Sequence, residues 1–406
     1  MVWSAGLTAR RRRTMTSTKT PLQDRVLGYG PRLALLWFLV PAALWALAYA
    51  RGRYNNYKIF KHVFWNLLEG RNLYVHYLEK YADVNHYGPT FAVVIAPFAI
   101  LPDALGGLLW CLAMAALLAW AVSRLDLPRE RRILLLAICS LELWDSLWSQ
   151  QFNAAIAALL LLTFQDVEEG RDFRAPLWIL IGAFVKLYSA VGLLFFFFAR
   201  DKKVFVAGAL TWGVVLLALP MAISSPAYVL QAYVDWYVEL VAKHAKNVVL
   251  YSSSDLSLMG LVRRASGRWI PSGWFYLVGI PLVLAPLLRV GQFRHYRFRT
   301  LFLASLLMFV VLFSSGSENT TYIVCATGAA LWFVEQERPF RRRNVVLLVA
   351  MLLVGIAPTD LLTMQVRDLT DAYAVIALPY TVIWLLLCRD LLTRNFDLSP
   401  PLSRPG

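Results

Sequence analysis

The sequence predicts an all-α polytopic membrane protein, and three observations support this fold class. Of the 406 residues, 59% are apolar and only 16% are charged, whereas soluble domains carry about a quarter charged residues. The mean hydropathy is +0.56, and apolar runs long enough to cross a bilayer recur along the chain. The net charge of +15 comes from short Lys/Arg clusters between these runs, which indicates membrane topology signals and argues against nucleic acid as a partner.

The first element is a basic segment followed by an apolar one. Residues 1–32 contain seven Lys or Arg residues and one acid, including the run Arg10–Arg13, and predict a cytoplasmic N-terminus. Leu33–Ala50 then predicts the first membrane helix. It is longer than the apolar part of a signal peptide, so we expect it to stay uncleaved.

The rest of the membrane domain, assigned to residues 33–390, consists of further apolar runs. Together they predict about ten to twelve crossings, followed by a cytoplasmic tail at 391–406. Two runs of about 12 residues, 90–101 and 153–164, are short for a crossing, so one or both are expected to be re-entrant. The runs are 90–101, 104–122, 133–148, 153–164, 176–198, 204–220, 273–288, 301–313, 322–334, 345–355 and 374–387.

Loop charges predict the orientation. The Arg/Lys-rich segments 199–203, 289–299, 335–343 and 389–404 are expected in the cytoplasm, together with both termini. The neutral or acidic segments 165–175, 314–321 and 355–373 are expected outside, as are the long loops 51–89 and 221–272. The protein is therefore predicted to lie in the cell membrane as a multi-pass protein.

The two long external loops are the first places to look for chemistry. In the first, apolar residues recur at helical spacing and end at Gly70, which predicts an amphipathic helix in the membrane interface; they are Ile59, Phe60, Val63, Phe64, Leu67 and Leu68. The second loop is rich in Tyr and Trp and is a candidate site for a polar head group.

Lys186 is the clearest candidate within the membrane, about ten residues into the run 176–198. A charge at this depth costs about 2.5–3.5 kcal/mol, so such residues usually have a function. Lys186 could bind a lipid phosphate or pyrophosphate, or it could pair with Glu142 or Asp145. These two acids belong to a polar cluster with Gln150, Gln151 and Asn153, which either faces a cavity or bonds neighbouring helices.

Two external carboxylates are candidate catalytic groups. Asp83 precedes the start of a membrane helix and could deprotonate a sugar hydroxyl, although it could also be a solvated loop acid. Glu318 is the only charge in its short loop. The four cysteines have no ligand spacing, so no metal is expected, and the motifs of nucleotide binding and of soluble hydrolases are missing. No cofactor is therefore expected.

The order of several motifs resembles glycosyltransferase family 87, a family of polytopic GT-C-type enzymes related to mycobacterial polyprenol-phosphate-mannose-dependent mannosyltransferases. A first membrane helix is followed by an interfacial helix ending in Leu67-Leu68-Glu69-Gly70-Arg71-Asn72-Leu73-Tyr74. Then come Tyr87-Gly88-Pro89-Thr90-Phe91-Ala92 and Ala96-Pro97-Phe98-Ala99-Ile100-Leu101-Pro102. Gln151-Phe152-Asn153 is similar to the family's Gln-x-Asn element, and Lys186 falls at its helix-borne lysine.

The resemblance implies transfer of a hexose, for example mannose, from a polyprenyl-phosphate donor to an external lipid or glycan acceptor. Asp83 and Glu318 are then the catalytic candidates, and the expected donor- or acceptor-binding residues are Lys186, Asn56, Asn55, Arg53, Tyr87, Gln151 and Asn153. One departure stands out, because the family has an Asp as catalytic base at the start of the interfacial helix where this chain has Asn56. An amide cannot accept the proton of a hydroxyl.

Two other functions stay open at this stage. One is a secondary transporter or flippase for a lipid-linked sugar, although paired broken helices in two related halves are not visible in the sequence. The other is a non-catalytic subunit of an envelope-assembly complex, which Asn56 suggests. The expected partners are the bilayer, a lipid-linked sugar donor and a glycolipid or glycan acceptor.

Overall fold

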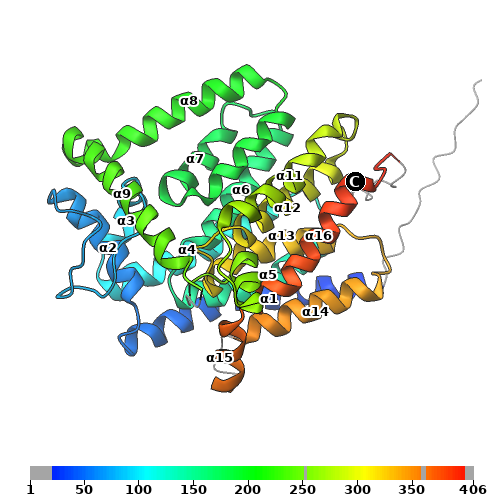
Figure 1. Ribbon diagram of the computed structural model, residues 1–406, viewed down its shortest axis with the longest axis horizontal. Coiled ribbons are helices and arrows are strands. Elements are labelled where there is room, and N and C mark those ends of the chain that lie inside the picture. The colour runs from blue at the N-terminus through cyan, green and yellow to red at the C-terminus, as the bar shows by residue number, and fades with distance from the viewer. Residues whose placement is uncertain (1–20, 251–253, 358–362, 398–406) are drawn as a thin grey trace, which may run out of the picture.

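The computed structural model describes residues 21–250, 254–357 and 363–397, and within these ranges the chain is all-helical with no strand (Figure 1). This confirms the predicted all-α class. The α-helices are α1 (Pro21–Ala50), α2 (Asn55–Leu68), α3 (Phe91–Ala99), α4 (Asp103–Ser123), α5 (Arg129–Trp148), α6 (Asn153–Glu168), α7 (Ala175–Val185), α8 (Lys202–Ala218), α9 (Pro226–Asn247), α10 (Leu258–Ser266), α11 (Ser272–Leu284), α12 (Tyr296–Leu312), α13 (Tyr322–Val334), α14 (Arg342–Ile356), α15 (Met364–Ala372) and α16 (Ala377–Thr393). Short 3-10 helices are η1 (Leu187–Phe198), η2 (Leu219–Ala222), η3 (Ala285–Leu288), η4 (Val290–Gln292) and η5 (Asn319–Thr321).

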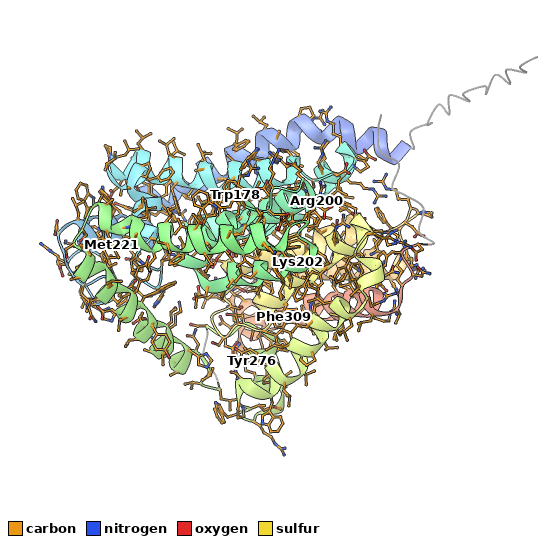
Figure 2. All side chains as sticks on the ribbon, turned by 90° about the horizontal axis from the view of Figure 1, so that it is seen from above. Trp178, Arg200, Lys202, Met221, Tyr276 and Phe309 are labelled. Carbon is orange, nitrogen blue, oxygen red and sulfur yellow. The ribbon has the colours of Figure 1, made fainter. Side chains whose placement is uncertain are left out.

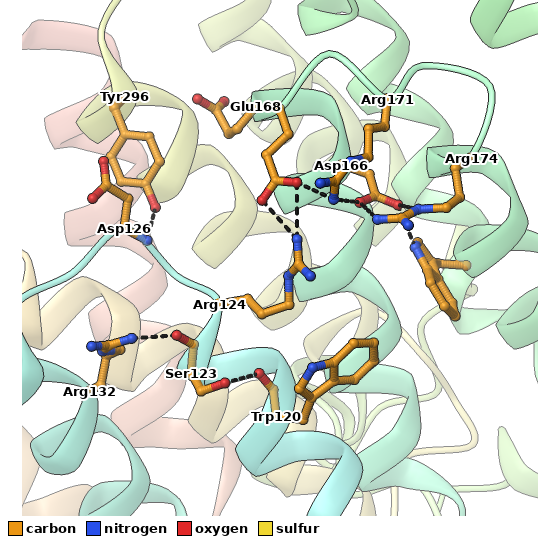
Figure 3. A network of polar contacts seen from close by, with 12 residues as sticks. Trp120, Ser123, Arg124, Asp126, Arg132, Asp166, Glu168, Arg171, Arg174 and Tyr296 are labelled. Atoms are coloured by element: carbon orange, nitrogen blue, oxygen red, sulfur yellow. Dashed lines mark hydrogen bonds and ion pairs between the residues drawn. The ribbon is translucent and has the colours of Figure 1, made fainter.

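Ion pairs tie together the helix ends on one side of the bundle, which we call the arginine end (Figure 3). Arg124, after α4, donates to Glu169 at 2.7 Å, and Arg174 donates to Asp166 at 2.6 Å. Arg299 of α12 is paired with Glu168 of α6. Loops that are distant in sequence therefore share one surface.

The opposite side, which we call the cavity end, brings together the loops around residues 55, 86, 150 and 316. Helices α4, α6 and α12 run between the two ends, because each has contacts at both. For example, α6 begins at the cavity end with Asn153, which bonds Lys186, and ends at Glu168, which pairs with Arg299.

The run 176–198 is not a crossing, contrary to the sequence prediction. Helices α7 and η1 form a re-entrant hairpin that begins and ends at the arginine end, with Lys186 at its turn. The backbone N–H of Asp201, after η1, donates to Asp172, before α7, at 2.7 Å. The two ends of the hairpin therefore lie side by side. At Gly182 an added Cβ would lie 2.0 Å from Ser189 Oγ, so the two arms pack closely. Because a mostly apolar run of 23 residues is long enough to span, run length alone could not reveal this turn.

The hairpin also corrects the predicted orientation of one loop. Residues 165–175 were expected outside because they carry acids, but they lie at the same end as 199–203 and as the arginines of 289–299. Their acids neutralise those arginines, which is why they belong there.

The short run 90–101 forms the nine-residue helix α3, which lies wholly at the cavity end. Its length is only about 14 Å at 1.5 Å per residue. It packs on α2, where the Tyr57 hydroxyl donates to the carbonyl of Phe98 at 2.9 Å. In contrast, the run 153–164 is part of α6 and reaches the arginine end. The expectation of a half-spanning segment thus holds for α3 and not for α6.

The described residues include three helices long and apolar enough to cross a membrane, Gly30–Ala50, Asp103–Ser123 and Lys202–Ala222. There are four if α15 and α16, bent by 48° relative to each other, count as one span. Membrane helices are therefore confirmed, while the number of ten to twelve crossings stays a prediction. The first helix begins earlier than predicted, at Pro21, and residues 1–20 and 398–406 of the two predicted tails lie outside the described residues.

Helix α2 begins at Asn55 and ends at Leu68, close to the predicted amphipathic helix. Gly70, two residues later, has φ +66°, a conformation that costs glycine little. The loop 221–272 is largely helical, since α9 and α10 occupy much of it.

Candidate functional site

A cavity of about 480 Å³ opens at the cavity end. Its walls come from α2, the loop before α3, the tip of the α7–η1 hairpin, α9, α11, α12 and the loop after α12. Polar residues on the wall are Asn56, Asp83, His86, Tyr87, Gln151, Lys186, Tyr188, Lys243, His244, Asn247, Ser314, Ser315 and Glu318. Apolar residues gather near α11 and α12, among them Tyr276 and Phe309, which Figure 2 labels.

Lys186 lies at the tip of the hairpin, on the cavity wall. Its Nζ donates to Asn153 Oδ1 at 2.8 Å and lies 4.4 Å from the centre of the Tyr188 ring. The alternative pairing with Glu142 or Asp145 is not observed. The Glu142 carboxylate accepts from the Tyr380 hydroxyl at 3.0 Å instead, and among the described residues Asp145 Oδ2 has no hydrogen-bond partner. Lys186 is thus held by neutral groups, and it lines the cavity.

The two candidate catalytic carboxylates both line the cavity. Asp83 is exposed, its Oδ1 accepts from the backbone of Val84 at 2.9 Å, and its φ of 78° is rare for a residue other than glycine. Such backbone strain is typical of functional positions. Glu318 caps the short turn Asn319–Thr321 and lies 3.7 Å from Lys243 Nζ.

The three residues predicted around the start of α2 have different surroundings. Asn56 lines the cavity, and its Nδ2 donates to the carbonyl of Ser149 at 2.8 Å. Asn55 exchanges two hydrogen bonds with the backbone of Ala82 and so fixes the loop. Arg53 is exposed and is not part of the cavity wall. Only Asn56 is therefore placed to touch a ligand.

The polar cluster at the end of α5 both faces the cavity and bonds a neighbouring helix. Gln151 reaches the cavity, where its Oε1 accepts from the Tyr87 hydroxyl at 2.7 Å. Asn153 holds Lys186 and also donates to the carbonyl of Thr320 at 2.9 Å. Glu142, by contrast, bonds the neighbouring helix α16 through Tyr380.

Several cavity residues were not predicted as site residues. His86 Nδ1 lies 3.0 Å from Glu239 Oε1 on α9, and burial together with Lys243 lowers the pKa of His86 to about 3. One turn further along α9, His244 Nδ1 lies 2.8 Å from Ser315 Oγ. The signal for His86 was its place directly before the Tyr87 motif, and the signal for α9 was its Tyr/Trp-rich sequence.

The cavity combines lysines that can bind an anion with carboxylates that can act as a base. Lys186 and Lys243 can bind a phosphate, while Asp83 and Glu318 can accept a proton. In the described ranges, no group of three His, Cys, Asp or Glu side chains could hold a metal ion.

Comparison with known proteins identifies the family. A sequence model of glycosyltransferase family 87 matches residues 85–315, more than half of the chain. The matched segment contains Tyr87, Gln151, Lys186 and the whole of α9, and it ends just before Glu318. Neither a curated protein nor a solved structure gives a significant match. The chain is a member of glycosyltransferase family 87 and hence a membrane glycosyltransferase.

Proposed function

We propose that this protein transfers a hexose, with mannose as the first to test, from a polyprenyl-phosphate donor to a hydroxyl of an extracytoplasmic glycolipid or glycan. The observation that carries the proposal is a single cavity in which a lysine deep in the bundle, Lys186, shares the walls with two carboxylates, Asp83 and Glu318. A lipid-linked sugar phosphate needs a cation at the phosphate and a base for the incoming hydroxyl.

In this reaction the acceptor oxygen forms a bond to the anomeric carbon of the sugar, and the bond from that carbon to the phosphate oxygen breaks. The phosphate leaves with the electron pair, and the hydroxyl proton goes to a carboxylate. Negative charge grows on the phosphate as the bond breaks, so Lys186 stabilises the transition state more than the bound donor.

Asp83 is our first choice for the base and Glu318 the second. Asp83 is exposed at the mouth of the cavity, and its Oδ1 has one hydrogen bond, to its neighbour's backbone. The Glu318 side chain already caps a turn and lies 3.7 Å from Lys243 Nζ, so it is less free to approach an acceptor hydroxyl. Either residue would replace the Asp that is missing at position 56.

We place the cavity end outside the cell and the arginine end in the cytoplasm, following the excess of arginines at the latter. A flippase is less well supported. Such a protein needs a route through the bundle, whereas the arginine end is closed by ion pairs such as Arg124–Glu169 and Arg299–Glu168. A non-catalytic subunit is also less well supported, because two carboxylates remain in the cavity.

The test is transfer by the purified protein in liposomes, with radiolabelled polyprenyl-phosphate mannose as donor and a lipid extract of the cell envelope as acceptor. We expect labelled glycolipid or glycan and loss of the donor. A nucleotide-linked mannose should give no product. If the wild-type protein leaves polyprenyl-phosphate mannose and other polyprenyl-phosphate hexoses intact, the proposed donor class is wrong.

A further inference from the structure

The cavity has a second polar centre that the reaction above does not use, formed by His86 and Glu239. His86 lies in the loop before α3, and Glu239 lies on α9, so the pair joins two segments that are far apart in the chain. The distance from His86 Nδ1 to Glu239 Oε1 is 3.0 Å. Both side chains are mostly buried, with exposed fractions of 24% and 18%.

The backbone around His86 is held in place by contacts with α9 and with the hairpin. Trp236, one turn before Glu239 on the same face of α9, donates from its indole N–H to the backbone carbonyl of His86 at 2.9 Å. The same indole packs against Gly88, where an added Cβ would lie 2.9 Å from the ring. The backbone of Gly88 in turn donates to the carbonyl of Val185 at 3.1 Å, next to Lys186. The loop that carries His86 is therefore fixed on the cavity wall without a bound substrate.

Burial and the charges around His86 affect the protonation of its imidazole ring. Burial lowers the pKa of His86 to about 3, and Lys243, Lys186 and Lys246 act in the same direction, while Asp83 opposes them. Burial raises the pKa of Glu239. Burial and the three lysines therefore favour the uncharged ring over the imidazolium.

A neutral imidazole has one N–H and one bare nitrogen. Nδ1 lies 3.0 Å from Glu239 Oε1 without the geometry of a hydrogen bond. A bare nitrogen this close to a carboxylate oxygen would be repelled, which favours the tautomer with the hydrogen on Nδ1. Nε2 is then the acceptor. His86 lines the cavity, and in the described part of the chain its Nε2 has no hydrogen-bond partner.

We propose that His86, held beside Glu239, binds a hydroxyl of the acceptor next to the attacking one through Nε2, as a hydrogen-bond acceptor. The proposal rests on the proposed function, because it assumes that the acceptor is a hydroxyl compound. The cavity is then divided between a phosphate side with Lys186 and a hydroxyl side with His86. Asp83 lies in the same loop as His86, three residues earlier, and lines the same cavity.

The first measurement is nitrogen NMR of the full-length protein in nanodiscs, labelled at histidine, with His86→Gln to assign the signal. We expect a neutral ring with the hydrogen on Nδ1 from pH 5 to pH 8, and loss of that tautomer preference in Glu239→Gln. A ring that titrates near its ordinary pKa, or one with the hydrogen on Nε2, overturns the proposal. This readout needs no turnover, so it is independent of the proposed donor.

The second measurement uses polyprenyl-phosphate mannose as donor and octyl mannoside as the acceptor probe. One lost hydrogen bond predicts a rise of about three- to tenfold in the acceptor KM of His86→Gln. Donor cleavage by water should stay within about twofold of wild type. The matched control is His76→Gln, an exposed histidine of the same loop, which should leave both values unchanged. An unchanged acceptor KM in His86→Gln refutes the binding role, whereas a wild-type protein that cleaves no donor refutes the proposed function instead.

Discussion

Replacing Lys186 with methionine tests the proposed phosphate site most directly, because Met keeps an unbranched side chain one atom shorter and removes the ammonium group with its charge and N–H donors. A hydrogen bond to a charged group is worth about 1.5–3 kcal/mol. Two unit charges 4 Å apart interact by about 4 kcal/mol at the effective dielectric of a protein surface. Since 1.4 kcal/mol corresponds to a factor of ten, kcat/KM should fall by about ten- to a thousandfold.

The fold should survive this change. Lys186 has no buried acid as a hydrogen-bond partner, so the variant leaves no unpaired carboxylate behind. Asn153 Oδ1 loses its donor, but Asn153 keeps its bond to the carbonyl of Thr320. An unsatisfied buried acceptor costs about 1–3 kcal/mol, which should lower the melting temperature without preventing extraction of folded protein.

The assay is transfer from polyprenyl-phosphate mannose in liposomes, with the melting temperature measured on the same preparation. Arg53→Met is the matched control, because Arg53 is a cation near the start of α2 that lies outside the cavity wall, and its rate should stay within about twofold of wild type. Near-normal activity in Lys186→Met would refute the phosphate role. A variant that cannot be obtained folded would show that Lys186 is structural.

Three further predictions concern the base, the hairpin and the topology. Asp83→Asn should lower kcat by about a hundred- to ten-thousandfold and Glu318→Gln by less than about tenfold, with donor KM kept in both; full activity in both variants excludes these carboxylates as the base. Gly182→Val should lower the melting temperature, because its Cβ would meet Ser189 Oγ at 2.0 Å, whereas Gly213→Val, with no atom within 4 Å, is the control; equal melting temperatures would contradict the tight hairpin. In a cysteine-free background, an impermeant thiol reagent should label Lys80→Cys in intact cells, and labelling of Arg342→Cys would refute the orientation.

The sequence predicted much of the fold because helix ends and apolar runs are local signals. The charge of Lys186 inside an apolar run pointed to a functional position, and Asp83, Tyr87, Gln151 and Glu318 were picked out by motif or by isolation; all five line the cavity. The re-entrant turn at Lys186 was missed, since nothing in the length of 176–198 distinguishes one crossing from two half-crossings. The pair His86–Glu239 was missed because it forms only when α9 packs over the loop before α3, a contact between segments distant in the chain.

The hairpin formed by α7 and η1 determines on which side of the bundle each later loop lies. A segment that turns back at Lys186 adds no crossing, so residues 170 and 203 lie on the same side of the bundle. Counting 176–198 as a crossing inverts every later helix and puts the loop around Ser315 on the opposite side from Asp83, although both line one cavity. A reporter enzyme fused after residue 170 and one fused after residue 203 should therefore give the same signal, and the C-terminal half reaches its final orientation only if the hairpin turns back during insertion.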